Sequence, residues 1–488
     1  MMAMICKATM KATDACTDNL ISIMRFNVKK TFKLGALLSA LSISMPLYAQ
    51  PYNTPETWGG DLTSRQRLTG DWGGLRDDMA KKGIVFDMDL YWMPQEITSG
   101  GKDETSGLWG NAIATLNVDT QKLGWWPGGF LKVQTVTSFN NNLIKDTGTI
   151  VPANLSWMLP TIEPDTGIQE FTYTQFLSQH FGVFAGKINS IAPTNVLHGD
   201  YTTGFMNTGL NLPLALAMVP LSAYGAGALY LPSHDVTLAG MVLDANGTIK
   251  NNDLGDAFKD GVMVLGSADL KVKPMGLAGH QNLTLAWSNK DRTSLIQDPS
   301  NIARLLLTER FPRLGNPGPA LVEILENHAP GLLTPAQPLN KENDTWAAVY
   351  SFEQFLWQPS GQPHQGIGMF FSAGVSDGKA NPIKYSYNLG LVGKGVVPGR
   401  PNDNFGIGWA RTEFSDNFVP YLRDTFNLGL NHEDVVELYY NAAVTPWLSV
   451  SPNLQIISPA LNKTLDSNKN FTDLDTTYIA GVRVGIRF

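Results

Sequence analysis

Apolar side chains recur at every second position along much of this chain, and the alternation continues to the last residue. In 478–488 one face carries Tyr, Ala, Val, Val, Ile and Phe, and the other carries Ile, Gly, Arg, Gly and Arg. A period of two residues is typical of a β-strand with unlike faces. Because chain ends fray unless they are held, this pattern predicts a final strand that is paired within a sheet.

Sixteen alternating segments are predicted, and no apolar run outside the start of the chain reaches the 18 residues of a membrane helix. The segments begin near residues 84, 112, 129, 169, 182, 222, 235, 261, 281, 344, 366, 384, 404, 434, 447 and 477. Only 16% of the residues are charged, against about a quarter in typical soluble proteins. The chain is therefore either a large soluble β protein or a closed barrel in lipid.

The start of the chain has the form of a secretory signal. Basic residues precede the apolar stretch LGALLSALSISMPLYA, and we expect cleavage after Ala49, with the true start at Met1 or Met24. We predict a signal peptide at 1–49, an N-terminal periplasmic segment at 50–83 and a barrel at 84–488. Both cysteines fall in the signal, so the remaining 488 − 49 = 439 residues offer no disulfide and no Cys-based site.

Charge and motifs exclude several functions. Six of the 36 Lys and Arg residues and two of the 43 Asp and Glu residues lie in 1–49, which leaves 30 against 41 and argues against nucleic acid as a partner. The seven histidines are scattered, without His-Glu-x-x-His, and no Gly-x-Ser-x-Gly is found. We expect no catalytic residue, metal or cofactor, and we do not expect an enzyme.

The links between the predicted strands are alternately long and short, as in outer-membrane barrels with external loops and short periplasmic turns. The run 377–403 departs from this order, and 289–343 contains two stretches with helical spacing, which we interpret as short helices in an external loop. The prediction is an all-β fold, a sixteen-stranded antiparallel transmembrane β-barrel. Phe488 would end its closing strand at the periplasmic interface, facing outer-membrane lipid. Outer-membrane proteins in general resemble this chain in ending on a strand with a final Phe, and the resemblance implies that Phe488 is the signal that the assembly machinery reads.

The stretch LTGDWGGLRDDMAKKGI resembles the start of the carbohydrate-selective porin (OprB) family, in which a Gly-Asp-Trp-Gly-Gly-x-Arg element precedes the first strand. DTQKLGWWPGGFLKVQ, QFLSQHFGVFAGKIN, GKGVVPGRPNDNFGIG and VVELYYNAAVTPWLSVSPNLQIISP support the resemblance. It implies a bacterial outer-membrane sugar porin, monomeric or homotrimeric. From the residues alone we interpret the first element as a short periplasmic helix, capped by Asp71 and stopped by Gly83.

Inward-facing polar side chains are the candidate pore lining, because the face opposite lipid lines water. Alternation predicts that the inward set includes Lys132, Gln134, Glu170, Thr172, Lys187, Ser351, Glu353, Glu437, Asn441 and Arg483. Both signs of charge are present, which suits a hydroxyl-rich solute better than an ion. The alternative is that these residues pair with one another and only stiffen the wall.

Residues 189–221 are predicted to form the external loop that folds inward and narrows the channel, because they occupy the rank of the third external loop of sixteen-stranded porins. Asp200 and Tyr201 are its candidate solute contacts, with His198, Phe205 and Asn207 nearby. An external flap is the alternative.

We therefore predict passive, substrate-biased diffusion of mono- or small oligosaccharides into the periplasm. The pore follows from the residues and the sugar from the resemblance. A general porin, a porin for another solute, and a secreted β-sandwich that binds carbohydrate are the alternatives.

Overall fold

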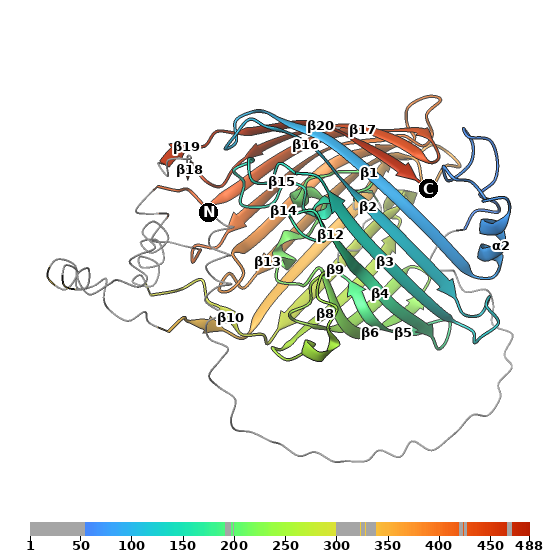
Figure 1. Cartoon of the computed structure of the whole chain (residues 1–488), viewed down its shortest axis with the longest axis horizontal. Coiled ribbons are helices and arrows are strands. Elements are labelled where there is room, and N and C mark those ends of the chain that lie inside the picture. Colours follow the sequence, from blue (N-terminus) through green and yellow to red (C-terminus); the bar gives the residue numbers. More distant parts are fainter. Residues whose placement is uncertain are drawn as a thin grey trace, which may run out of the picture.

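The computed structural model describes residues 54–190, 197–198, 200–298, 338–418, 427–465 and 471–488, and the single residues 323, 327 and 423 (Figure 1). The predicted signal peptide, 1–49, lies outside the described residues. So do nearly all positions of the two helices expected within 289–343.

Sixteen antiparallel strands form one closed barrel, in which each strand pairs with its neighbour along the chain and β20 pairs with β1. The strands are β1 (Ile84–Ser99), β2 (Ser106–Asp119), β3 (Gly129–Phe139), β4 (Thr166–Phe176), β5 (Phe181–Asn189), β6 (Ser222–Ser233), β7 (Val236–Asp244), β8 (Val262–Val272), β9 (Gly279–Ser288), β12 (Thr345–Trp357), β13 (Gly366–Ser376), β14 (Ile383–Lys394), β15 (Asn404–Phe414), β16 (His432–Thr445), β17 (Leu448–Ser458) and β20 (Thr477–Arg487). The predicted fold class is confirmed.

The register shows two unlike faces. Val242, Val264, Trp287 and Trp346 lie opposite one another on β7, β8, β9 and β12, and all four are exposed. The next row, which starts at Leu243 and ends at Thr345, is fully buried. An exposed outer row of apolar and aromatic side chains is the surface that a barrel presents to lipid.

The links follow the predicted alternation, with two exceptions. At one end of the barrel the strands are connected by the links 140–165, 190–221, 245–261, 289–344, 415–431 and 459–476, and at the other end mostly by shorter turns. The first link was predicted to be long but spans only 100–105, because β1 and β2 continue as a paired hairpin from Glu96 and Ser106. Link 377–382 is shorter than turn 395–403, as the sequence indicated.

Among the described residues, two small hairpins lie at the end of the barrel that carries the long links. β10 (Arg292–Thr293) pairs with β11 (Lys341–Glu342), and β18 (Lys463–Leu465) pairs with β19 (Phe471–Asp473). Figure 1 shows both hairpins at the end of the barrel away from the label α2.

The N-terminal segment packs at the end with the short turns. Its helix α2 (Leu75–Lys81) begins after Gly74, and Gly83 has the left-handed φ of 88° predicted for its stop. Asp71 was predicted to cap this helix, but that prediction is wrong, because its carboxylate accepts from the Gly73 amide before the helix begins. Among the described residues no helix is long and apolar enough to cross a membrane.

Arg76 fixes α2 to the seam where β1 meets β20. Its guanidinium contacts the Asp87 carboxylate at 2.9 Å and the main-chain oxygen of Phe488 at 3.1 Å. The Phe488 amide donates to Met88 at 2.8 Å, which continues the pairing of β20 with β1. The role of Phe488 as an assembly signal stays a prediction.

Candidate functional site

A loop crosses the interior of the barrel. We call residues 197–220 the crossing loop, without residue 199, which is not described. It joins β5 to β6, yet it contacts β12, β13, β14 and β15, which lie on the far side of the closed strand order. It contains two short helical turns, α3 (Thr208–Asn211) and η2 (Leu214–Leu216). The predicted inward fold of this link is therefore found, and the alternative of an external flap is wrong.

Glu353 of β12 holds the first part of the crossing loop. Its carboxylate accepts from the Leu197 amide at 2.9 Å and from the His198 amide at 3.1 Å, and it lies 2.6 Å from His198 Nδ1. The His198 ring stacks on Phe370 of β13 with a centroid separation of 4.0 Å. Both the backbone and the side chain of the loop are thus fixed by one buried carboxylate.

Two oppositely charged side chains hold the middle of the loop. Glu437 of β16 accepts from the amides of Met206 and Asn207 at 2.7 and 2.8 Å. Arg483 of β20 donates to the carbonyls of Tyr201 and Gly204 at 2.7 and 3.0 Å. The carboxylate accepts from backbone amides and the guanidinium donates to backbone carbonyls, and such charge-assisted hydrogen bonds satisfy a buried charge.

Amide and hydroxyl side chains of the wall hold the last part of the loop. Asn388 donates to the Gly209 carbonyl at 3.3 Å, and the Ala215 amide donates to Ser386 Oγ at 3.1 Å. Asn381 donates to the Ala215 carbonyl at 2.8 Å. The crossing loop is therefore fixed to the far wall from Leu197 to Ala215. Met218, near its end, packs instead with Leu243 of β7 and Met263 of β8.

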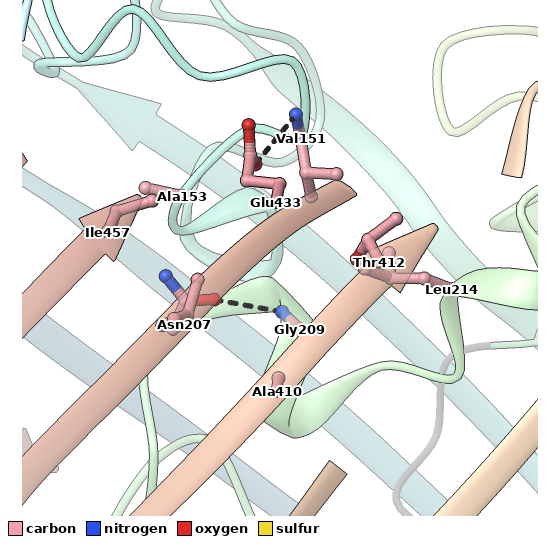
Figure 2. Close-up of a pocket in the computed structure, with 10 residues that line it drawn as sticks. Val151, Ala153, Asn207, Gly209, Leu214, Ala410, Thr412, Glu433 and Ile457 are labelled. Carbon is pink, nitrogen blue, oxygen red and sulfur yellow. Dashed lines mark hydrogen bonds between the residues drawn. The ribbon is translucent and has the colours of Figure 1, made fainter. Parts of the chain in front are cut away.

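A second link, which we call the inner loop (140–165), also folds inward. Glu433 of β16 accepts from the Ile150 and Val151 amides at 2.9 and 3.2 Å. Figure 2 shows Glu433 reaching Val151 where both loops meet β15, β16 and β17. The space left there is about 10 Å³, which is no larger than one water molecule requires.

The two loops pack on each other. The Thr208 amide donates to the Ala153 carbonyl at 2.8 Å, and the Leu155 amide donates to Thr208 Oγ1 at 2.8 Å. The buried Trp157 ring lies edge-on against Tyr201 of the crossing loop, at a centroid distance of 5.0 Å. Both loops therefore form one inward plug over part of the lumen.

Burial shows where the lumen stays open. On β13 and β15 buried residues recur at every second position, because the crossing loop covers their inner face. On β6, β7 and β8 most residues are partly or fully exposed on both faces. Water therefore has access to the lumen beside β6–β8, and the plug lies against the opposite wall.

The predicted lining residues fall into three groups. Lys132, Gln134 and Glu170 are inward and partly exposed, and Lys132 pairs with Glu170 at 2.7 Å. Asp200 is exposed and Tyr201 is half-buried on the crossing loop. The inward residues that are buried are Thr172, Ser351, Glu353, Glu437, Asn441 and Arg483. Glu353, Glu437 and Arg483 contact loop backbone, and a direct contact of these residues with solute stays a prediction.

Lys187 was predicted to point inward, and the register shows that this is wrong. Lys187 lies opposite Phe171 on one side and Tyr224 on the other, and the Phe171 row continues through Val133 to the outward Phe86. Alternation failed here because both faces of the strand FGVFAGKIN are largely apolar. The Lys187 ammonium is satisfied by the carbonyls of Ile249 and Asn251 and by the side chain of Asn252.

Asp200 carries a negative charge into the open lumen. Desolvation by the surrounding protein raises the pKa of Asp200, although the residue is exposed. Hydrogen bonds from Thr202 and Thr203 and the positive charge of Arg483 lower this pKa by more than desolvation raises it. The net pKa of Asp200 lies below the ordinary value of 3.8. The carboxylate is therefore ionised throughout the neutral range.

Three lumen charges near Asp200 were missed. Asp89 of β1 and Arg487 of β20 lie opposite each other in the strand register and face inward. Lys394 is the last residue of β14 and also faces inward. Asp200 is within electrostatic range of Asp89 and Lys394. The alternation that placed Arg483 and Glu437 inward also places Arg487 and Glu433 inward, so this signal was present in the sequence.

The described residues contain no cluster of three His, Cys, Asp or Glu side chains that could hold a metal ion. The site is built from charges, amides and aromatic rings. This arrangement can bind and orient a polar solute in passage.

Comparisons with known proteins agree with this architecture. Residues 108–488 match the model of the family described as carbohydrate-selective porin, OprB family. A candidate porin of Acinetobacter baylyi, QuiX, is 22% identical over 500 residues, covering 94% of this chain and 99% of that protein. Porin B of Pseudomonas aeruginosa is 28% identical over 145 residues, which is 27% of this chain and 30% of Porin B.

A solved structure shares the fold. The high-pH structure of Pseudomonas putida OprB has a TM-score of 0.68, is 20% identical and covers 87% of this chain and 99% of its own. The barrel, its outward apolar rows and the family match over most of the chain together place the protein in the outer membrane as a channel. The chain belongs to the carbohydrate-selective porin family, OprB.

Proposed function

We propose that this channel lets mono- or small oligosaccharides diffuse passively into the periplasm, with a bias toward neutral, hydroxyl-rich solutes. The observation that carries the proposal is the composition of the open lumen beside the plug. Its charged groups include the cations Lys132, Arg487 and Lys394 and the anions Glu170, Asp89 and Asp200. These six charges cancel. On β8, beside the open lumen, the inward Asp269 and Lys271 also cancel, so no single sign dominates the passage.

Opposed charges across water favour dipolar solutes. A fixed field between cations and anions orients hydroxyl dipoles, and each hydroxyl both donates and accepts a hydrogen bond. An ion of either sign would meet repulsion from half of the same groups. The half-buried Tyr201 beside Trp157 adds an aromatic surface that suits the C–H face of a sugar ring.

In this proposal the buried wall residues act through the loop. Glu353, Glu437 and Arg483 position the backbone that presents Asp200 and Tyr201 to the lumen. They shape the constriction rather than contacting the sugar. The description of the family as carbohydrate-selective supports the substrate class.

Planar-bilayer recording tests the proposal. Purified protein is inserted into a lipid bilayer, and single-channel current is measured while neutral sugars of increasing size are added. We expect a reproducible, concentration-dependent block of current by mono- or small oligosaccharides. A channel whose current is equally insensitive to sugars and to polyethylene glycols of the same size would be a general porin and would overturn the proposal.

A further inference from the structure

An apolar groove lies on the outer face of the barrel, at the end that carries α2. Ile84, Val118, Leu131 and Tyr173 lie opposite one another on β1, β2, β3 and β4 and form its floor. This row shares its face with the exposed Phe86, so it faces the membrane and not the lumen. The turn 120–128 contributes the opposite side of the groove through Leu123, Trp125 and Trp126.

The groove is shaped by aromatic side chains. Trp125 and Trp126 stack with a centroid separation of 5.7 Å, and Trp126 Nε1 donates to the Tyr173 hydroxyl at 2.5 Å. Trp125 is 64% exposed and Trp126 is 50% exposed, which is unusual for residues with so large an apolar surface. The groove has a volume of about 450 Å³, and Thr120 is the one aliphatic hydroxyl in its lining.

Two lysines lie at the edge of the groove. Lys82 follows α2 and Lys122 lies in the turn, and both are exposed. Both lysines lie next to Gly83. Lys82 precedes Gly83 in the chain, and a Cβ added at Gly83 would lie 2.7 Å from Lys122 Cβ. The Asp119 amide also donates to the Gly83 carbonyl, which holds the turn against the end of α2. Within the described part of the chain neither ammonium group forms an ion pair.

We propose that this groove binds one anionic glycerophospholipid, with an acyl chain over the Ile84–Tyr173 row and the phosphate at Lys82 and Lys122. The location selects this occupant. The short turns of outer-membrane barrels lie on the periplasmic side, where the membrane leaflet consists of phospholipid. Aromatic rings at headgroup height and basic side chains beside them are the features that hold a lipid at an interface.

Native mass spectrometry of the purified protein in detergent, with added phosphatidylglycerol or phosphatidylcholine, tests the proposal. We expect one retained phosphatidylglycerol, bound about tenfold or more tightly than phosphatidylcholine. The double variant K82Q/K122Q loses the preference for phosphatidylglycerol but still retains lipid. The double variant W125A/W126A loses both. The control K271Q/K273Q, which removes two lysines near the turn 273–278, behaves as the wild type.

Four results would overturn the proposal. The first is equal retention of both lipids by the wild type. The second is an unchanged preference in K82Q/K122Q. The third is a protein dimer or trimer that W125A/W126A dissociates, which would make the groove an interface between copies of the chain. The fourth is retention of the lipid by Leu131→Trp, which fills the groove without removing a side chain from its edge. Each variant is checked for heat-modifiable migration, which shows that the barrel has folded.

Discussion

Glu437→Gln should loosen the middle of the crossing loop while leaving the barrel intact. In the wild type the two carboxylate oxygens accept from the Met206 and Asn207 amides at 2.7 and 2.8 Å, and Asn453 donates to one of the same oxygens. The substitution keeps the size of the side chain but replaces one oxygen with an NH₂ group. One loop amide then faces a donor, and the other bond is no longer charge-assisted.

The magnitude follows from those two changes. A buried donor without an acceptor costs about 1–3 kcal/mol, and the change from a charged to a neutral acceptor costs about 1 kcal/mol more. The total of about 2–4 kcal/mol corresponds to a rise of about thirtyfold to several hundredfold in the population of the locally open loop. Glu353 and Arg483 still hold the neighbouring parts, so the opening is confined to residues near Met206.

Amide hydrogen exchange measured by mass spectrometry reports this population. We expect exchange in a peptide containing 205–212 to accelerate by about this factor in Glu437→Gln, and single-channel current to become noisier. Glu170→Gln is the matched control, since Glu170 is inward but contacts Lys132 and Thr172 and, among the described residues, hydrogen-bonds to no loop backbone. Wild-type exchange in Glu437→Gln would refute the role of this carboxylate in holding the loop.

Three further predictions concern the faces, the charges and the titration of the lumen. Val482→Arg, on the outer face, should cost about 2–4 kcal/mol of folding free energy, whereas Gln134→Arg, on the inner face, should cost little; equal yields of heat-modifiable barrel would contradict the face assignment. Asp200→Asn should move the reversal potential in a salt gradient toward anion preference and Lys394→Gln toward cation preference, most clearly at low ionic strength, and an unchanged potential in both would remove these groups from the pathway. Because the pKa of Asp200 is lowered, its negative charge should persist as pH falls through the ordinary aspartate range. Thr202→Val with Thr203→Val should raise this pKa, so that the contribution of Asp200 to cation selectivity is lost at a higher pH than in the wild type; superimposable pH profiles of the reversal potential would contradict this.

The sequence predicted the barrel well because lipid and water impose opposite demands on alternate residues. All sixteen strands were predicted, and the largest error in a starting position is at β2, which begins at Ser106 instead of near 112. The same alternation placed Glu353, Glu437 and Arg483 inward correctly. It failed at Lys187, where neither face of the strand is distinctly polar and a loop satisfies the amine.

Alternation cannot show what fills the lumen. An inward charge is expected to meet water, but Glu437 and Arg483 meet the backbone of a loop that is more than 200 residues away in the sequence. The rank of the link 189–221 indicated an inward fold, yet the second inward segment, 140–165, had no comparable signal. Its anchor Glu433 was recognisable only as a residue four positions before Glu437 on the same face.

Sugar flux into liposomes tests the central claim most directly. Vesicles containing the purified protein are placed in isotonic solutions of a neutral monosaccharide, of its anionic acid and of its cationic amine, which are matched in size, and the rate of swelling is recorded. The opposed charges beside the plug predict that the neutral sugar enters fastest and that entry slows as the sugar becomes an oligosaccharide. If either charged solute enters as fast as the neutral sugar, or if no sugar enters, the account is wrong.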